Sequence, residues 1–215
     1  MKRQFIAIAA SGAATVALAS SCPTGEALLK NNTPLSSLCP NGFGQFSPGG
    51  IQNAMQNQSN NVAMITAAAQ NYGVPTDLAL AVSYHESEGF NSCAGSDTGV
   101  KGPMQLTQST GSSLGFNRDI NEQNINGGMA LLAKAANSCG ATNYSCLAAK
   151  YNGSNRPGEQ AGWAAGVAKA DQQLKNNPSL MAAACPGSGC NPNTGNAPAA
   201  PAGPLTTPSS PTLVG

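Results

Sequence analysis

A chain of 215 residues is long enough for one domain with its own core, and a hydrophobic fraction of 40% excludes disorder along its whole length. Only 9% of the residues are charged and the formal net charge is +1, so the sequence carries no basic surface of the kind that binds nucleic acid. Alanine is prominent among the apolar residues and aromatic residues make up 5%, which predicts tightly packed helices with small contact residues.

Residues 1–19 have the features of a secretory signal peptide. Lys2 and Arg3 precede an apolar run that is too short to span a bilayer, and residues 17–19 read Ala-Leu-Ala, a small-residue cleavage site. A membrane anchor is the alternative. The residues up to Cys22 are similar to a lipoprotein processing site, although the leucine lies one position too far from the cysteine. We therefore expect export to the periplasm, with secretion, or a lipid anchor on the membrane through Cys22, as alternatives.

Seven cysteines agree with export, because an oxidising compartment allows cysteines to pair. Three pairs are expected: Cys139 with Cys146 across a short turn between helices, Cys185 with Cys190 around a small loop, and Cys39 with Cys93 between the N-terminal segment and a later loop. Cys22 is left over. No metal site is expected, because the sequence has no C-x-x-C pair and a single histidine, His85.

Proline and glycine divide the first part of the chain. Residues 20–50 carry four prolines and predict an irregular N-terminal segment. A helix is expected over 51–72, with an inner side formed by Ile51, Met55, Val62, Met64, Ile65 and Ala69. Gly73 ends this helix, and Pro75 lies in the first turn of the next one, where its fixed φ is favourable.

The second helix is expected to run to about Glu88. Its apolar face is formed by Leu78, Ala81, Val82 and His85, which recur at helical spacing. Glu86 lies at the edge of this face, near the C-terminal end of the helix. Partial burial should raise the pKa of this carboxyl group, and so should the helix dipole, which disfavours an anion at that end.

Loops and helices alternate in the rest of the chain. Residues 89–102 contain four glycines and predict a loop, and residues 111–119 are rich in turn formers. Further helices are expected from Pro103 through Leu106, and over 121–137, 143–151 and 159–175. Residues 178–215, rich in proline, alanine and glycine, predict a disordered tail. No useful alternating strand pattern occurs, so the fold class is mostly α, with one domain over 51–177.

Carboxylate acid/base chemistry is the catalytic option that these residues leave open. Glu86, Glu88 and Asp97 lie within twelve positions of one another beside the glycine-rich loop, although the sequence has only nine acidic residues. His85 is adjacent to Glu86 and so faces elsewhere, which excludes a Ser-His-Asp set. A phosphate-binding loop and a dinucleotide fingerprint are absent from the sequence. A surface glutamate without function is the simpler alternative.

Four blocks then follow one another in the chain. They are Glu86-Ser87 with Gly89-Phe90-Asn91, Gly102-Pro103-Met104-Gln105-Leu106, Asn124-Ile125 before Gly127-Gly128, and Tyr151-Asn152-Gly153. In order and approximate spacing, over roughly residues 60–170, they resemble the lytic transglycosylase domain of the soluble, lysozyme-like type. The first block is one residue longer than the common family form, which leaves Glu88 as a rival of Glu86.

The resemblance implies a lysozyme-like helical fold and a reaction on peptidoglycan that needs no cofactor. One carboxyl group protonates the bond between N-acetylmuramic acid and N-acetylglucosamine, then takes a proton from the sugar's own C6 hydroxyl, giving a 1,6-anhydro end. The residues implied are Glu86 as acid and base, Ser96, Met104 and Gln105 along the sugar subsites, Tyr151 bonded near the glutamate to orient it, and Asn152 beside it.

Two other functions remain open at this point. A hydrolytic muramidase similar to goose-type lysozyme would use water in place of the C6 hydroxyl, with Asp97 as the group that orients it. A protein that binds the wall without cleaving it, and assists assembly, is the other. The expected partners are peptidoglycan strands and, by resemblance to small specialised transglycosylases, components of a secretion or conjugation machine.

Overall fold

The computed structural model describes residues 25–44 and 49–184. The expected signal peptide, Cys22, the Cys185–Cys190 pair and the tail beyond Ala184 lie outside these residues. Ten helices and three isolated β-bridges make up the regular structure of the described part. The prediction of a mostly α fold is therefore confirmed. None of the described helices combines the length and the apolar character that crossing a membrane requires.

The expected helix over 51–72 is divided into α3 (Ile51–Asn57) and α4 (Ser59–Tyr72). The break lies at Gln58, whose backbone leaves the helical region at φ −118° and ψ 36°. It falls in a run of Asn, Gln and Ser, whose side chains compete with the helical backbone for hydrogen bonds. All six residues expected on the inner side are buried, so the apolar pattern was right although the helix is not continuous.

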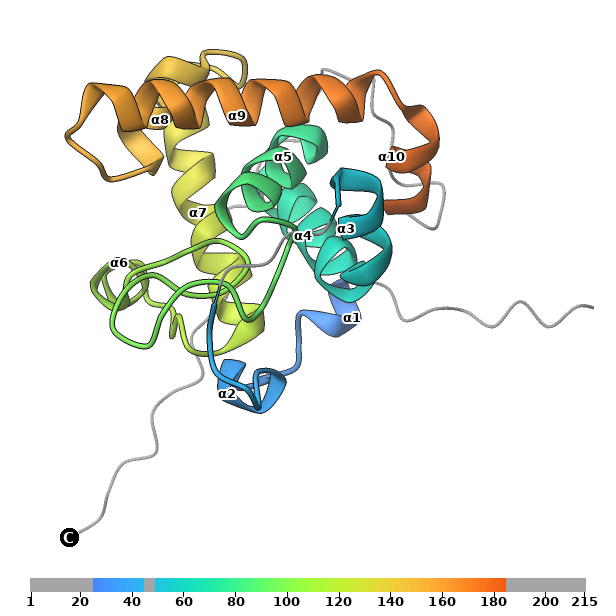
Figure 1. Cartoon of the computed structure of the whole chain (residues 1–215), viewed down its shortest axis with the longest axis vertical. Coiled ribbons are helices and arrows are strands. Elements are labelled where there is room, and N and C mark those ends of the chain that lie inside the picture. The colour runs from blue at the N-terminus through green and yellow to red at the C-terminus, as the bar shows by residue number, and fades with distance from the viewer. Residues whose placement is uncertain (1–24, 45–48, 185–215) are drawn as a thin grey trace, which may run out of the picture.

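Helix α5 (Thr76–Glu86) carries Glu86, the expected catalytic acid, as its last residue. It starts directly after Pro75 and ends at Glu86, two residues before the expected end. Six consecutive residues, 78–83, are buried, because α5 packs between α4 and α9 (Pro157–Lys175). Figure 1 shows α9 crossing above α5. A helix covered on most sides can hold a side chain at its end in a fixed place.

Helix α7 (Asn121–Cys139) packs against α4 and α8 (Tyr144–Tyr151), and α8 packs against α9; both helices lie close to their expected bounds. The phenol of Tyr144 on α8 hydrogen-bonds to the buried Asp171 on α9. Lys175, one turn further along α9, is 2.6 Å from the same carboxylate and 3.3 Å from that of Asp77 on α5. This network joins the three helices at the end of α5 away from Glu86.

Two stretches that were not expected to be helical contain helices. Helix α6 (Gln108–Ser113) occupies part of the stretch expected to be turns, and the Thr107 hydroxyl caps it by accepting from the backbone N–H of Thr110 at 3.0 Å. Helix α10 (Pro178–Ala184) lies where the tail was expected to begin. Met181 and Ala184 are buried against the preceding helices, so apolar burial stabilises this short helix despite its place beside a tail of low complexity.

The N-terminal segment contains two single-turn helices, α1 (Gly25–Leu28) and α2 (Leu35–Leu38). A disulfide between Cys39 and Cys93 ties it to the loop after α5, as predicted. A second disulfide, between Cys139 and Cys146, joins the end of α7 to the first turn of α8, which was also predicted. The segment is therefore covalently fixed to the wall of the site described next.

Candidate active site

Glu86 is the last residue of α5, and its carboxyl group accepts a hydrogen bond from a tryptophan side chain. Trp163 on α9 donates a hydrogen bond from Nε1 to Oε1 of Glu86 at 2.6 Å. Burial raises the pKa of the Glu86 carboxyl from 4.5 to about 7, and the hydrogen bond from Trp163 opposes part of this rise. The pKa of Glu86 is thus raised, as expected from the sequence, and burial is the main cause. A carboxyl group with this pKa exists in both protonation states near neutral pH.

The rival acid has a different environment. Glu88 is exposed and lies beyond the end of α5, with a left-handed backbone at φ 49°. The additional residue of the first block is therefore accommodated in a tight turn, which also contains Phe90 at φ 63°. This turn directs the buried Phe90 ring into the core and leaves Glu88 on the surface.

Two cavities meet at Glu86. The larger, of about 690 Å³, is lined by Glu86, Met104, Gln105, Tyr151 and Asn152, among others. The smaller, of about 430 Å³, is lined by residues 85–88 and 94–96, Val100 and Gln105. Glu86, Val100 and Gln105 line both, and all six site residues expected from the sequence line at least one of them, Ser96 in the smaller. An acid with space on both sides suits a substrate that continues in both directions.

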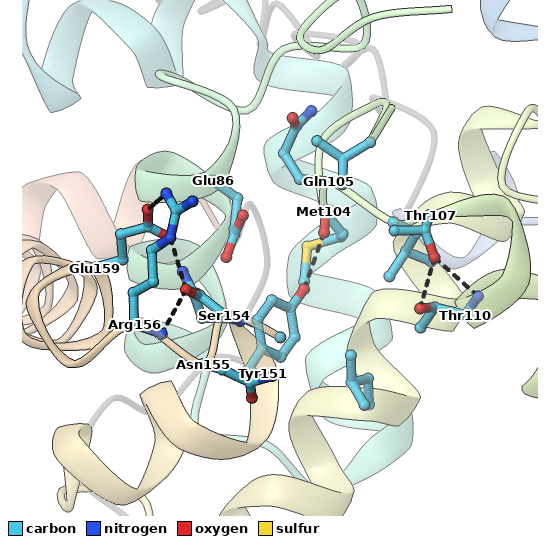
Figure 2. A pocket seen from close by; sticks show the side chains of 15 residues that line it. Glu86, Met104, Gln105, Thr107, Thr110, Tyr151, Ser154, Asn155, Arg156 and Glu159 are labelled. Carbon is cyan, nitrogen blue, oxygen red and sulfur yellow. Dashed lines mark hydrogen bonds and ion pairs between the residues drawn. The ribbon is translucent and has the colours of Figure 1, made fainter. Parts of the chain in front are cut away.

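Figure 2 shows the side chain of Glu86 pointing into the larger cavity. Gln105 and Met104 lie on one side of it, and Ser154, Arg156 and Glu159 on the other. On that second side, the Glu159 carboxylate accepts hydrogen bonds from the Ser154 hydroxyl at 2.6 Å and from Arg156 at 2.8 Å. The wall formed by residues 154–159 is therefore polar, and its polar and charged side chains bind one another.

The segment after Pro103 is a tight turn and not the expected helix. Side chains from elsewhere in the chain bind three of its carbonyl groups: Pro103 by Ser83 Oγ at 2.9 Å, Met104 by Tyr151 Oη at 3.1 Å, and Leu106 by Arg118 at 3.3 Å. Within the turn, Gln105 Nε2 binds the carbonyl of Gly102 at 2.8 Å. Gln105 itself is left-handed, at φ 47°. These contacts outside the segment replace the helical hydrogen bonds that the sequence led us to expect, and they fix Gln105 between the two cavities.

Helix α7 supports this turn from below. Asn124, which is fully buried, accepts a hydrogen bond from the Met104 N–H at 3.0 Å and donates one to the Lys101 carbonyl at 2.8 Å. One turn further along α7, a Cβ atom on Gly128 would lie 2.3 Å from Cβ of Met104. The third sequence block therefore has a structural explanation, since its asparagine satisfies the turn and its glycine makes room for it.

Arg118 anchors the glycine-rich loop, and the sequence did not single it out. Its guanidinium group is buried and donates to the carbonyl oxygens of Gly99, Leu106 and Asp97, the last at 3.4 Å. It also forms an ion pair with Asp119 at 3.3 Å. A buried arginine bonded mainly to backbone carbonyls leaves no periodic signal in a sequence.

Tyr151 is buried beside Glu86, but its hydroxyl is bonded to the Met104 carbonyl and not to the glutamate. Its ring stacks on Trp163, with centroids 5.8 Å apart and an interplanar angle of 30°. Burial, and then the nearby charge of Glu86, hold the pKa of the phenol well above 10.0. The hydrogen bond to Glu86 that the resemblance implied for Tyr151 is thus made by Trp163. One available signal was that a buried tryptophan N–H needs an acceptor.

The remaining two residues are placed at the edges of the cavities. Ser96 is exposed, and its hydroxyl accepts a hydrogen bond from the Gly99 N–H at 2.9 Å. The side-chain oxygen of Asn152 accepts one from the Ser154 N–H at 3.1 Å. Both side chains support a loop, and both border the space next to Glu86. Among the described residues, no cluster of three His, Cys, Asp or Glu side chains forms a candidate metal site.

Comparison with known proteins identifies the family to which this chain belongs. The family model Transglycosylase SLT domain matches residues 63–184, a range that ends at the last residue of α10. Over 72 residues the chain is 44% identical to the Membrane-bound lytic murein transglycosylase F of Desulfosudis oleivorans. The aligned part is 33% of this chain and 16% of that protein, so the chain spans a small part of the relative's length. No solved structure matches the chain significantly.

Proposed function

Since this chain belongs to the SLT transglycosylase family, we propose that it is a lytic transglycosylase acting on peptidoglycan. It would cleave the β-1,4 bond between N-acetylmuramic acid and N-acetylglucosamine and leave a 1,6-anhydro end. The observation that carries this proposal is the environment of Glu86. Of the acidic residues in the described chain, it alone lines both cavities, and burial raises the pKa of its carboxyl to about 7.

In the first step, protonated Glu86 gives its proton to the glycosidic oxygen. The bond from that oxygen to the anomeric carbon breaks, the N-acetylglucosamine chain leaves as an alcohol, and positive charge develops on the muramic acid ring. A pKa of about 7 means that a substantial fraction of the carboxyl groups carries the proton at neutral pH. An ordinary glutamate, with a pKa of 4.5, would be almost entirely ionised there.

In the second step, the Glu86 carboxylate removes the proton from the C6 hydroxyl of the same ring. The C6 oxygen bonds to the anomeric carbon, the anhydro ring closes, and Glu86 regains the proton that it gave away. No water is consumed. The nucleophile belongs to the substrate, so its effective concentration is high and no second carboxylate is required to activate it.

The position of Asp97 supports this reaction over hydrolysis. Most glycosidases use two carboxyl groups across the bond that they cleave. The side chain of Asp97, the group considered for orienting a water molecule, is 81% exposed and 3.5 Å from the ammonium group of Lys101. It lines neither of the two cavities that contain Glu86. A hydrolytic muramidase would need another base beside the anomeric carbon.

The other expected site residues have proposed roles along the glycan. Gln105 lies between the two cavities, where its amide can bond to sugars on either side of the cleaved bond. Met104, Tyr151 and Asn152 would contact sugars in the larger cavity, and Ser96 those in the smaller. Because the Tyr151 hydroxyl binds the Met104 carbonyl, we propose that Tyr151 maintains the shape of the sugar subsite and does not orient Glu86.

We also propose a cellular setting. Two disulfides within the described residues support folding in an oxidising compartment, consistent with export through a signal peptide at residues 1–19. The periplasm is the proposed location, with lipidation of Cys22 or secretion as alternatives. A role in local wall opening for a secretion or conjugation machine rests on the resemblance to small specialised transglycosylases, with the residues after Ala184 as a candidate tether.

Digestion of purified peptidoglycan tests the activity. The muropeptides released by the full chain should have masses lower by one water than the hydrated products, as 1,6-anhydro ends require. Hydrated reducing ends would show a muramidase instead. Binding to the wall without any release would overturn both enzymatic functions and favour an assembly protein. Protein carrying Glu86→Gln provides the blank for contaminating wall-cleaving enzymes.

A further inference from the structure

We propose that Trp163 is a positioning residue for Glu86, because its indole N–H fixes one carboxyl oxygen and leaves the other to exchange the proton with substrate. The inference rests on the function proposed above and adds a residue to it. Trp163 and Glu86 are 77 positions apart in sequence, on α9 and α5, and meet at 2.6 Å between Nε1 and Oε1. Trp163 is only 3% exposed.

The indole group is itself held in place. On one side Tyr151 stacks on it, with ring centroids 5.8 Å apart. On another side the imidazole of His85 meets it edge-on, with centroids 6.1 Å apart and an interplanar angle of 88°. Gly166, almost one turn after Trp163, makes room for that imidazole, because a Cβ atom there would lie 2.4 Å from two of its ring atoms. The N–H direction is therefore set by contacts from α5 and α8 as well as by α9.

The chemistry of the hydrogen bond determines where the proton of Glu86 resides. An indole N–H can only donate, so Oε1 serves as the acceptor whether the carboxyl group is ionised or neutral. In the neutral state the proton therefore lies on Oε2, the oxygen that Trp163 does not occupy. The same oxygen is free to accept the proton back from the C6 hydroxyl. One donor thus prepares both steps of a reaction in which a single carboxyl group must act twice.

The hydrogen bond also balances the effect of burial. Burial favours the neutral acid and the Trp163 N–H favours the carboxylate, so the pKa of about 7 reflects both. Other ionisable groups face this region. Burial lowers the pKa of His85, opposed in part by the charge of Glu88, and burial raises the pKa of Tyr151, so in both groups burial favours the neutral form. Across the larger cavity, Glu159 is paired with Arg156 at 2.8 Å, and Glu88 lines the smaller cavity from the exposed turn.

Fluorescence gives a test of the contact that does not depend on activity. The sequence has a single tryptophan, so the indole emission reports only on Trp163. We expect the emission of the full chain to change with pH around a midpoint near 7, and this transition to disappear in Glu86→Gln. A transition at lower pH that survives this substitution would be that of His85. Emission that titrates identically in both proteins would overturn the contact.

Replacement of the N–H tests its effect on the reaction. In Trp163→Phe the ring remains and the donor is lost, so the midpoint of the alkaline limb of the kcat/KM profile should rise by about one to two pH units. The maximal kcat should fall about 10- to 100-fold with little change in KM. A fall in kcat with the limb unmoved would reduce Trp163 to a packing residue and overturn the proposal.

A second variant protects the test against misfolding. Biosynthetic replacement of tryptophan by its benzothienyl analogue exchanges the N–H for sulfur at this one position and keeps the shape of the ring. It should reproduce the rise in the midpoint of the alkaline limb expected for Trp163→Phe. A midpoint equal to that of the wild type would overturn the proposal. If the unmodified chain releases no muropeptides, the proposed function fails, whereas the fluorescence titration still decides whether Trp163 and Glu86 are coupled.

Discussion

The Tyr151 hydroxyl donates its hydrogen bond to the carbonyl oxygen of Met104, at 3.1 Å, while the neighbouring Glu86 carboxylate is bonded to Trp163. Two aromatic residues that stack on each other therefore have separate tasks. One fixes the turn that borders the cavities, and the other fixes the acid. The difference leads to distinct expectations for the two side chains.

Tyr151→Phe should affect stability more clearly than acid/base behaviour. The substitution keeps the ring and leaves the buried Met104 carbonyl without its donor, which should reduce the free energy of unfolding by about 1–3 kcal/mol. Denaturant unfolding measures this loss. The pH midpoints of kcat/KM should stay within a few tenths of a unit of the wild-type values. A shift of a full unit would show that Tyr151 acts on Glu86 directly.

Glu86→Gln and Glu88→Gln form a matched pair, since each removes one carboxyl group and the two positions are two residues apart. Release of muropeptides should be lost in Glu86→Gln, because an amide cannot donate the proton to the glycosidic oxygen. Glu88→Gln should retain most of the activity, since its side chain is exposed. The reverse pattern would identify Glu88 as the acid and exclude the mechanism proposed for Glu86.

The raised pKa of Glu86 also predicts how stability changes with pH. Its folded-state pKa, about 7, is above the ordinary value of 4.5, so the folded protein binds more protons between these values. This contribution to stability is complete below pH 4.5 and is lost as the pH rises through 7. Glu86→Gln, which cannot ionise, should therefore gain stability over the wild type by up to roughly 3 kcal/mol at pH 8.

Denaturant unfolding of both proteins at pH 4.5, 6, 7 and 8 measures this difference. Glu88→Gln, which removes an exposed carboxyl group two residues away, is measured alongside as the control for loss of a negative charge. A gap between Glu86→Gln and the wild type that stays constant over this pH range would contradict the raised pKa.

Gly128→Ala tests the close packing of α7 against the turn at residues 102–105, called the Met104 turn below. The added Cβ atom would lie 2.3 Å from Cβ of Met104, so the turn or α7 must move. We expect a net loss of about 1–3 kcal/mol in the free energy of unfolding, as for other overpacked cores, together with reduced activity. Gly162→Ala is the control, because that glycine is also helical but exposed with free space around it. It should stabilise the protein by up to about 1 kcal/mol through helix propensity.

The two disulfides should differ in how much each contributes to the free energy of unfolding. Cys39–Cys93 closes a loop with a sequence separation of 54, and Cys139–Cys146 one of 7. By loop entropy, replacing both cysteines with serine should cost roughly 4 kcal/mol for the first pair and roughly 2 kcal/mol for the second. The first replacement should also reduce activity, since Cys93 directly precedes the residues that line the smaller cavity. Equal effects on stability and activity would contradict this ranking.

The apolar pattern was sufficient to predict most helices and the place of Glu86. Leu78, Ala81 and Val82 recur at helical spacing and are all fully or almost fully buried, so the period of the helix brought Glu86 to the edge of the core. The two disulfides of the described chain were also predicted. Cys139 and Cys146 flank a short turn between two expected helices, and Cys39 with Cys93 was the expected link between the N-terminal segment and the glycine-rich loop.

The turn after Pro103 shows what the sequence does not reveal. A proline followed by Met-Gln-Leu is compatible with the first turn of a helix, and local preference favoured that interpretation. The carbonyl groups of this segment are instead bound by Ser83, Arg118 and Tyr151, which lie between 12 and 47 positions away. Such contacts exist only after the helices have packed. The same reason explains why Trp163 was not among the site residues expected from the sequence.

The bonds around the Met104 turn have a further consequence for how substitutions combine. Ser83, Asn124 and Tyr151 belong to three different helices, yet they bind backbone groups of two adjacent residues, Pro103 and Met104. Once one of them is removed and the turn shifts, the remaining bonds are already weakened, so a second removal should cost less than it does alone. Substitutions at these three positions should therefore be non-additive, with coupling energies of about 0.5–3 kcal/mol in double-mutant cycles. The wall of the groove behaves energetically as a single unit, although its parts are spread over almost 70 positions of the chain.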